Sequence, residues 1–205
     1  FDDTLSLILL TGESPVVTAT VPLGTQRSLT LEEQGEQTFY DARVSLDGWY
    51  SCHSCHTDGH TNGLQADTFG DEDRGAPKKI VTLRGVAHSG PWAWNGSKAT
   101  IEDQIKTSLI ISMQTQLPTD ELPIDSLAAY LRTLSAVPSV ATARDQLLDE
   151  NAHAGLMTTF QKFGCRDCHA DSAFTSNGVF DVGLHDEMGE TEFNPPSLLG
   201  VSQRA

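Results

Sequence analysis

The feature that most constrains this chain is a five-residue pattern, Cys-x-x-Cys-His, that occurs twice. The copies are Cys52-His53-Ser54-Cys55-His56 and Cys165-Arg166-Asp167-Cys168-His169, and they use all the cysteines of the 205 residues. This spacing is the attachment pattern of c-type haem. Two thiols spaced in this way can bond to the two vinyl groups of one porphyrin, and the histidine that follows can bind the iron. The sequence therefore predicts two covalently attached haems.

Three other structures use paired cysteines. A zinc ribbon places its pairs roughly 15–20 residues apart, much closer than Cys52 and Cys165, and four thiolates would leave the following histidines unnecessary. A thioredoxin-like redox pair needs a βαβ context, and none is visible in the sequence. A disulfide within each pair gives the histidines no role. We therefore interpret His56 and His169 as proximal iron ligands, and the four haem-binding cysteines as Cys52, Cys55, Cys165 and Cys168.

The charge of the chain limits its partners. The formal net charge is −15, from 28 acidic and 13 basic residues. This balance argues against nucleic acid and anionic membrane surfaces, and favours either a basic redox partner protein or a role in solubility alone. No segment reaches the roughly 18 apolar residues of a membrane span. Because bacteria attach haem covalently outside the cytoplasmic membrane, we expect a periplasmic, extracellular or cell-surface protein whose Phe1 is a processed or clipped end.

The predicted fold is mainly α, with two cytochrome c-like haem domains and a short β segment at the N-terminus. We expect the β segment at residues 1–29, the first haem domain at 30–136 and the second, incomplete, at 137–205. Leu5–Leu10 and Val16–Val21 are β-prone runs that flank a turn cluster. An isolated hairpin is marginally stable, so it is expected to pack on the haem domains or to end an upstream β domain.

Capping and periodicity predict the helices. Thr30-x-x-Glu33 is a capping box that begins a helix to about Asp41, and Thr100-x-x-Asp103 begins a second. Apolar residues spaced from Ile124 to Leu134 predict a third, and the last spans about 150–163, just before the second motif. The Gly- and Asp-rich stretch 57–77 is expected to be an irregular loop, and 136–139 a linker.

An internal repeat follows the two motifs. Thr82-Leu83-Arg84-Gly85-Val86 comes after the first, and Ser197-Leu198-Leu199-Gly200-Val201 comes at nearly the same distance after the second. The second copy stops before any counterpart of the Trp94 segment. Either the second copy is truncated or the second domain is naturally short. In the first case, we expect other domains or chains to complete the second haem site.

These motifs resemble, in order and spacing, the bacterial di-haem cytochrome c peroxidase and MauG-type superfamily over about residues 30–205. The matching runs are Phe39–Ser45, Ser51–His56, Thr82–Val86, Trp94–Gly96 and Thr100–Gln104. In that family one haem domain receives electrons and the other reduces peroxide, with a tryptophan between them. The resemblance implies that Trp94 carries electrons between the haems and that Gln104 lies in the peroxidatic pocket. The N-terminal strands are similar to the end of a β-propeller blade that precedes such a di-haem unit in some surface proteins.

Two positions depart from the family. The catalytic Glu of the family lies just before a Met, whereas here Ser112 precedes Met113. A serine cannot take up and return the peroxide proton as a carboxylate can, which argues against peroxidase activity. Where the family binds calcium, this chain has Lys78-Lys79, whose positive charges argue against a calcium ion.

The sixth iron ligands decide between electron transfer and an open, reactive iron. Met113 is the leading candidate distal ligand of the first haem, and the alternative is a core-filling side chain. Nine residues of regular helix would place Met113 opposite Gln104 unless the helix ends between them. His60 is a weaker candidate ligand. We expect a di-haem c-type cytochrome that transfers electrons; the alternatives are a peroxide-reducing enzyme and an accessory haem module of a larger assembly.

Overall fold

The computed structural model describes residues 4–12, 14–24, 27–69, 75, 77–138, 140, 144, 149–170 and 172–203. In these residues the regular secondary structure is mainly helical, as predicted, with five α-helices and short paired strands. The helices are α1 (Leu31–Tyr40), α2 (Cys52–Cys55), α3 (Ile101–Thr107), α4 (Ile124–Thr133) and α6 (Glu150–Lys162). The strands are β1 (Thr4–Leu9), β2 (Val16–Pro22), β3 (Gln65–Ala66), β4 (Lys78–Lys79), β5 (Phe180–Asp181) and β6 (Glu192–Phe193). The division into two cytochrome c-like domains, and the boundaries given for them, stay predictions.

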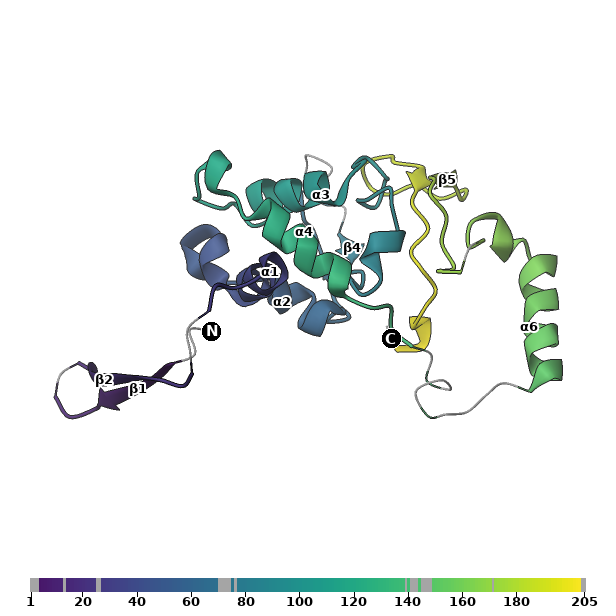
Figure 1. The fold of residues 1–205 in the computed structure, drawn as a ribbon. Coiled ribbons are helices and arrows are strands. Elements are labelled where there is room, and N and C mark those ends of the chain that lie inside the picture. Colours follow the sequence, from purple (N-terminus) through teal and green to yellow (C-terminus); the bar gives the residue numbers. More distant parts are fainter. Residues whose placement is uncertain are drawn as a thin grey trace.

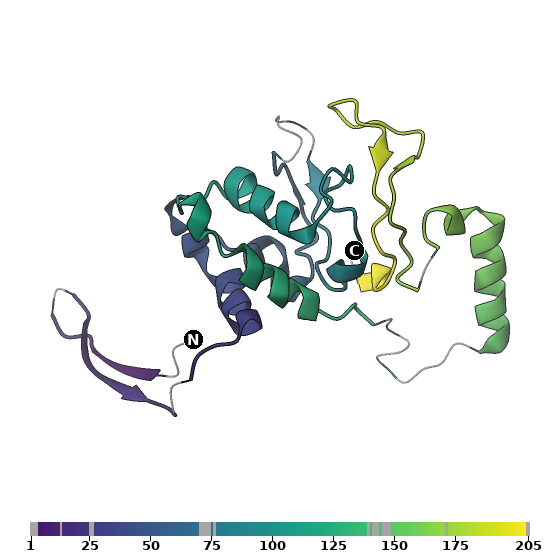
Figure 2. The same ribbon diagram turned by 45° about the horizontal axis from the view of Figure 1, so that its top comes forward.

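The predicted N-terminal hairpin is present. β1 and β2 pair antiparallel, with Leu5 opposite Val21 and a register shift between Leu7 and Ile8. The hairpin projects away from the helices at one end of the molecule in both views (Figures 1 and 2), and every residue of β2 is exposed. It therefore does not pack on the helical body, which was one of the two expected arrangements. Glu13, in the predicted turn, lies outside the described residues.

The core lies where α1 crosses α4. The predicted capping box begins α1: Glu33 N donates to Thr30 Oγ1 at 3.3 Å and Thr30 N donates to Glu33 Oε2 at 2.9 Å. Gly35 allows the close crossing, because a Cβ there would lie 1.9 Å from the backbone oxygen of Ser126. Phe39, one turn later, is almost completely buried. This crossing brings α1 close to α2, which carries the first motif (Figure 1).

The second predicted helix begins at its predicted cap and then changes its geometry. Asp103 N donates to Thr100 Oγ1 at 3.0 Å at the start of α3. After Thr107 the helix widens into a π-helix, η5 (Ser108–Ser112), in which Met113 N donates to Ser108 O at 2.8 Å. Five-residue hydrogen-bond spacing is characteristic of π-helices, which often occur at functional sites. The regular-helix angle between Gln104 and Met113 therefore does not apply.

The internal repeat is reproduced in the backbone. Arg84 N donates to Thr82 Oγ1 at 3.1 Å, and Leu199 N donates to Ser197 Oγ at 3.2 Å. A glycine with positive φ, Gly85 or Gly200, then begins a short 3-10 helix in each copy: η4 (Val86–His88) and η8 (Val201–Gln203). The two copies therefore share local hydrogen bonding as well as sequence.

The predicted linker is partly buried. Val137 is among the buried core residues, and Pro138 O accepts from Gln203 Nε2 at 2.8 Å; Ser139 lies outside the described residues. Beyond the linker, α6 stands at the opposite end of the molecule from the hairpin (Figures 1 and 2) and has no buried residue. The predicted loop 57–77 is irregular where it is described, apart from β3 and the 3-10 turn η3 (Thr57–Gly59). No helix in the described part of the chain has both the length and the apolar character needed to cross a bilayer.

Candidate functional site

The first motif forms a single helical turn. His56 N donates to Cys52 O at 2.9 Å, so α2 brings Cys52 and Cys55 to one side, three residues apart. Burial raises the pKa of the Cys52 thiol to about 11 and also raises the pKa of Cys55. Both thiols are therefore uncharged at neutral pH and lie in surroundings that suit an apolar group such as a porphyrin.

His56 is held in the form that binds metals. Its Nδ1 lies 2.9 Å from the backbone oxygen of Val81. Because a carbonyl can only accept a hydrogen bond, Nδ1 carries the proton and Nε2 keeps its lone pair. Burial lowers the pKa of His56, which keeps the ring neutral. A hydrogen bond of this kind orients metal-binding histidines and raises their basicity.

The second motif repeats this geometry. Its residues form the 3-10 turn η7 (Cys165–Asp167), and His169 N donates to Cys165 O at 2.9 Å. His169 Nδ1 lies 2.8 Å from the backbone oxygen of Phe174. The same argument therefore leaves the Nε2 lone pair of His169 available. The sequence contained no signal for Val81 or Phe174 in this role, because every residue has a backbone carbonyl.

An apolar cavity of about 560 Å³ lies beside the second motif. Its size falls within the range of roughly 300–1,000 Å³ that is usual for cofactor and ligand sites. The side chains that surround it are mostly apolar or aromatic, as a porphyrin requires. They belong to Trp94, Phe160, Gly164, Cys165, Cys168, His169, Phe180, Val182, Phe193, Asn194, Pro195, Pro196 and Leu198. The donor set of this motif and its apolar walls therefore fit a covalently held haem.

Trp94 comes from the first half of the chain but lines the cavity of the second motif. Its backbone oxygen accepts from Asn194 N at 2.8 Å. Two residues later, Gly96 is packed so closely that a Cβ there would lie 2.3 Å from Val179 Cγ1. The Trp94 segment is thus packed against the region of the second motif. The bridging role of Trp94 between the haems stays a prediction.

Gln104 has one partnered and one unpartnered polar atom. Its Nε2 donates to Ser108 Oγ at 3.0 Å, whereas its Oε1 is buried and has no hydrogen-bond partner in the described part of the chain. Leaving a buried acceptor unpaired costs about 1–3 kcal/mol. The place in a peroxidatic pocket that the resemblance implies for Gln104 stays a prediction.

Met113 and Ser112 follow the π-helix η5. Met113 is buried, and its Sδ lies 4.0 Å from Cys52 Sγ. The sulfur thus reaches the edge of the first motif, a position that suits both a ligand and a core residue. Ser112 Oγ donates to Thr68 O at 2.7 Å, and its backbone oxygen accepts from Tyr50 Oη at 2.5 Å. The hydroxyl of Ser112 is therefore already used within the protein.

His60 is engaged by the protein through both ring nitrogens. Nδ1 lies 2.7 Å from Thr82 Oγ1, and Nε2 lies 3.3 Å from the backbone oxygen of Gln203. A ring nitrogen with a protein partner is not free to bind iron, so this arrangement argues against His60 as a ligand. Instead His60 joins the first motif region to the second copy of the repeat.

Lys78 places a positive charge in the segment where the family has its calcium site. Its Nζ lies 2.7 Å from Asp186 Oδ2, and both side chains are mostly buried. Asp186 Oδ1 accepts the backbone N–H groups of Met188 and Glu190, each at 3.0 Å. The ion pair thus joins β4 to the loop between β5 and β6, and it supports the argument from the sequence against a calcium ion here.

The described part of the chain contains all four cysteines, and none of them is in a disulfide. No group of three or more His, Cys, Asp or Glu side chains converges within it on a common point that could hold a metal ion, as a zinc site would require.

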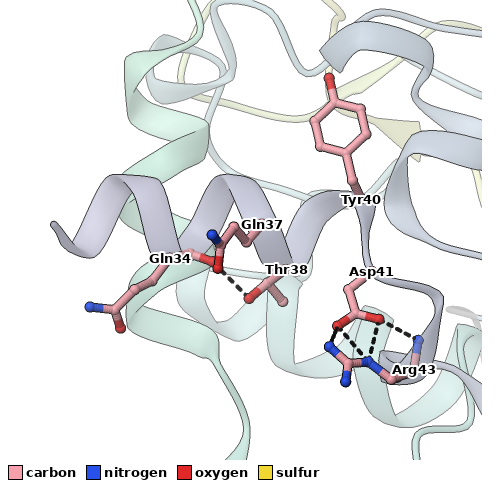
Figure 3. A pocket seen from close by; sticks show the side chains of 6 residues that line it. All are labelled: Gln34, Gln37, Thr38, Tyr40, Asp41 and Arg43. Carbon is pink, nitrogen blue, oxygen red and sulfur yellow. Dashed lines mark hydrogen bonds and ion pairs between the residues drawn. The ribbon is translucent and has the colours of Figure 1, made fainter. Parts of the chain in front are cut away.

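A separate open hollow at the end of α1 is lined by polar side chains, among them Asp41 paired with Arg43 (Figure 3), and carries none of the motif residues.

Comparisons with known proteins point to a haem-binding family, as the geometry of the two motifs does. Residues 30–154 match the family model described as di-haem cytochrome c peroxidase. The methylamine utilization protein MauG of Methylorubrum extorquens is 25% identical over 82% of this chain and 57% of its own length. The hydrazine synthase subunit gamma of Kuenenia stuttgartiensis is 28% identical over 80% of this chain and 54% of its own length. This chain therefore spans little more than half the length of either relative.

A solved structure shares the fold. A chain of Kuenenia stuttgartiensis hydrazine synthase, in a structure determined under xenon pressure, superposes with a TM-score of 0.73 at 21% identity. The match covers 94% of this chain and 85% of the other. At this level of identity the similarity concerns the fold alone.

Proposed function

Because the chain belongs to the di-haem cytochrome c peroxidase family, we propose that it is a di-haem c-type cytochrome that transfers electrons outside the cytoplasm. One observation carries the proposal. In both motifs the histidine donates Nδ1–H to a backbone carbonyl, at 2.9 Å for His56 and 2.8 Å for His169, and so presents Nε2. Haem supplies one-electron chemistry when it is bound.

The residues of the chain have distinct roles in this proposal. The cysteine pairs would anchor each porphyrin, and His56 and His169 would bind the irons. Phe160, Phe180 and Phe193 form apolar walls that exclude water at the second site. Trp94 comes from the first half of the chain and lines the same cavity, from which it would carry electrons between the two sites. A redox partner protein supplies or accepts the electrons, and other domains or chains complete the second site.

The mass and the spectrum of the protein test the proposal. The protein, produced with haem attachment machinery, is expected to keep two haems after denaturation and acid extraction. Replacing both Cys165 and Cys168 by Ser should remove the mass of one haem and half of the absorbance, and the matched pair Cys52→Ser with Cys55→Ser should do the same. Wild-type protein that loses all its colour on extraction would disprove covalent attachment.

A peroxide-reducing enzyme is the second candidate, and the buried Oε1 of Gln104 favours it. That atom could accept a hydrogen bond from a bound peroxide. Against it, Ser112 stands where the family has its catalytic Glu, and the Ser112 hydroxyl donates to Thr68. We therefore expect two six-coordinate haems that do not react with carbon monoxide or peroxide. If the wild type turned over peroxide and the Gln104→Leu variant did not, the protein would be established as an enzyme instead.

A role as an accessory module of a larger assembly is supported by the hairpin. Its strands expose large apolar side chains on both sides, including Leu5, Ile8, Val17 and Val21. Such a surface is typical of a β segment that is completed by another sheet. This role is compatible with electron transfer, and it would be tested by co-purification of the chain with a β-rich domain.

A further inference from the structure

His60 stands four residues after His56, and the proposed haem sites leave its side chain without a role. Both ring nitrogens have protein partners: Nδ1 lies 2.7 Å from Thr82 Oγ1, and Nε2 lies 3.3 Å from the backbone oxygen of Gln203. Thr82 directly follows Val81, whose carbonyl is the partner of His56. One residue thus separates the contact of His60 from the hydrogen bond of the proximal ligand.

The partners of His60 determine which ring nitrogen carries the proton. Because a carbonyl can only accept a hydrogen bond, the proton is on Nε2 and faces Gln203 O. In the neutral ring Nδ1 is then an acceptor, and the Thr82 hydroxyl donates to it. The Thr82 oxygen in turn accepts the backbone N–H of Arg84 at 3.1 Å. The Thr82 side chain is therefore held by one donated and one accepted hydrogen bond.

Thr82 is placed to orient the carbonyl that His56 uses. The Val81 carbonyl belongs to the peptide unit that ends at the Cα atom of Thr82, and its oxygen lies 2.9 Å from His56 Nδ1. A peptide unit is planar and turns as one body. Fixing the Thr82 side chain therefore restricts the direction in which this carbonyl points.

The backbone on either side of this peptide unit is held by the loop that carries His60. Thr61 Oγ1 donates to Ile80 O at 2.6 Å, and Leu83 N donates to Gly59 O at 3.0 Å. The hydroxyl contact of His60 lies between these two bonds. The loop thus supports the carbonyl from both sides, and His60 supplies the support closest to it.

The second copy shows the same connection made without a side chain. Ala173 stands four residues after His169, which is the place that corresponds to His60. The hydroxyl of Ser197 donates to Ala173 O at 2.5 Å. The next carbonyl along the chain, Phe174 O, is the one that His169 Nδ1 contacts. In both copies the hydroxyl of the repeat thus forms a hydrogen bond one residue away from the carbonyl that the motif histidine uses.

We propose that His60 is a positioning residue of the first haem site. Through the Thr82 hydroxyl it fixes the Val81 carbonyl, which accepts the Nδ1–H of His56. The inference rests on the proposed di-haem function and adds a determinant of the reduction potential of the first site. A hydrogen bond from Nδ1 makes a metal-binding histidine more basic, which favours ferric over ferrous iron. Loss of the His60 contact should therefore raise the reduction potential of the first site alone.

The test compares His60→Leu with His60→Asn in the haem-loaded full chain. The two new side chains are close in size, but only Asn offers an acceptor to the Thr82 hydroxyl. The reduction potential of each site is measured by spectroelectrochemical titration, and the sites are assigned with variants that lack one cysteine pair. His60→Leu should increase the ratio of ferrous to ferric iron at the first site about tenfold at a fixed applied potential, a shift of about 59 mV. His60→Asn should stay close to the wild type.

Two further measurements separate positioning from a general loss of structure. Thr82→Val should give the same rise, and His60→Leu added to it should cause no further change, because both substitutions act through one bond. Exchange of the His56 Nδ1 proton with solvent, followed by NMR in the ferrous protein, should become faster in His60→Leu. Ser197→Ala is the matched control, and it should shift the potential of the second site and leave that of the first unchanged.

Three results would overturn the inference: an unchanged first-site potential in His60→Leu, equal shifts in His60→Leu and His60→Asn, or equal shifts at both sites. A change in the spin state of the first iron would also overturn it, because His60 would then be an iron ligand. If His60→Leu does not load haem, Thr82→Val decides the outcome. A wild-type chain that carries no covalent haem would disprove the proposed function as well, whereas a loaded chain with an unchanged potential disproves the role of His60 alone.

Discussion

Gly85 and Gly200 pack against two adjacent residues, Ala136 and Val137 respectively. A Cβ on Gly85 would lie 3.0 Å from the Cβ of Ala136, and a Cβ on Gly200 would lie 2.5 Å from the Cβ of Val137. Both glycines have a positive φ, 80° and 66° respectively. The two copies of the repeat thus meet at Ala136 and Val137, so this segment helps to hold the halves of the chain together.

Replacing Gly200 by Ala is expected to lower the free energy of unfolding by about 3 kcal/mol, from the left-handed backbone and the clash with Val137. Gly85→Ala should cost less, about 1–2 kcal/mol, because its closest contact is longer. Chemical denaturation of the haem-loaded protein measures both. Gly155→Ala in α6 is the control: a Cβ there meets nothing within 4 Å, and it should stabilise by about 0.5–1 kcal/mol. A Gly200→Ala protein as stable as the wild type would contradict the close contact.

Replacing Met113 by Leu is expected to open the sixth position of the first iron if its sulfur is the distal ligand. Leu nearly preserves the volume and should cost less than about 1.5 kcal/mol, whereas Met113→Ala should cost about 2–5 kcal/mol. The measurement is the absorption spectrum of the reduced protein with and without carbon monoxide. New carbon monoxide binding in both variants supports ligation. An unchanged spectrum in Met113→Leu would show that the side chain only fills space.

The Lys78–Asp186 ion pair should make stability depend on pH. The hydrogen bond from Lys78 holds the pKa of Asp186 below its ordinary value of 3.8. Since the folded state binds this proton less tightly than the unfolded state, the stabilisation is present above that value and is lost as the pH falls through the folded pKa. Asp186→Asn should remove this part of the acid dependence, measured as the unfolding midpoint against pH.

Lys78→Met is the companion variant, and it should lower the free energy of unfolding at neutral pH by about 1.5–3 kcal/mol, as expected for a charged hydrogen bond. Addition of a calcium chelator should leave the wild type unchanged, because the lysine occupies the carboxylate. A large loss of stability on chelation would show that calcium binds after all.

Removal of the hairpin, residues 4–24, is expected to leave the haem spectrum and the unfolding midpoint of the remainder nearly unchanged. The strands are exposed along almost their whole length, so their loss takes little buried apolar surface from the helices. Circular dichroism and thermal unfolding of the shortened protein check this. A fall of the midpoint by more than about 4 °C would mean that the hairpin packs on the helical body.

Much of the local structure could be predicted because the signals are local. The capping residues Thr30 and Thr100 and the apolar spacing in α4 identified three helices, since capping and periodicity depend on neighbours a few residues apart. The repeat around Gly85 and Gly200 was also visible, because a backbone with positive φ favours glycine. The cysteine spacing is also a local signal, because it reflects the distance between the two vinyl groups of one porphyrin.

The tertiary structure alone decided what surrounds these motifs. Sequence patterns could not select Val81 and Phe174 as partners of the motif histidines, because every residue has a carbonyl and only the path of the chain brings one within reach. The π-helix after Thr107 likewise has no local sequence signal, so the angle between Gln104 and Met113 could not be derived from regular-helix spacing. Trp94 lines the cavity beside the second motif, and this arrangement depends on contacts between segments that are far apart in the sequence. The sequence by itself determined the chemistry of the two motifs and the local helices, and long-range packing determined the orientation of each histidine and the shape of the cavity.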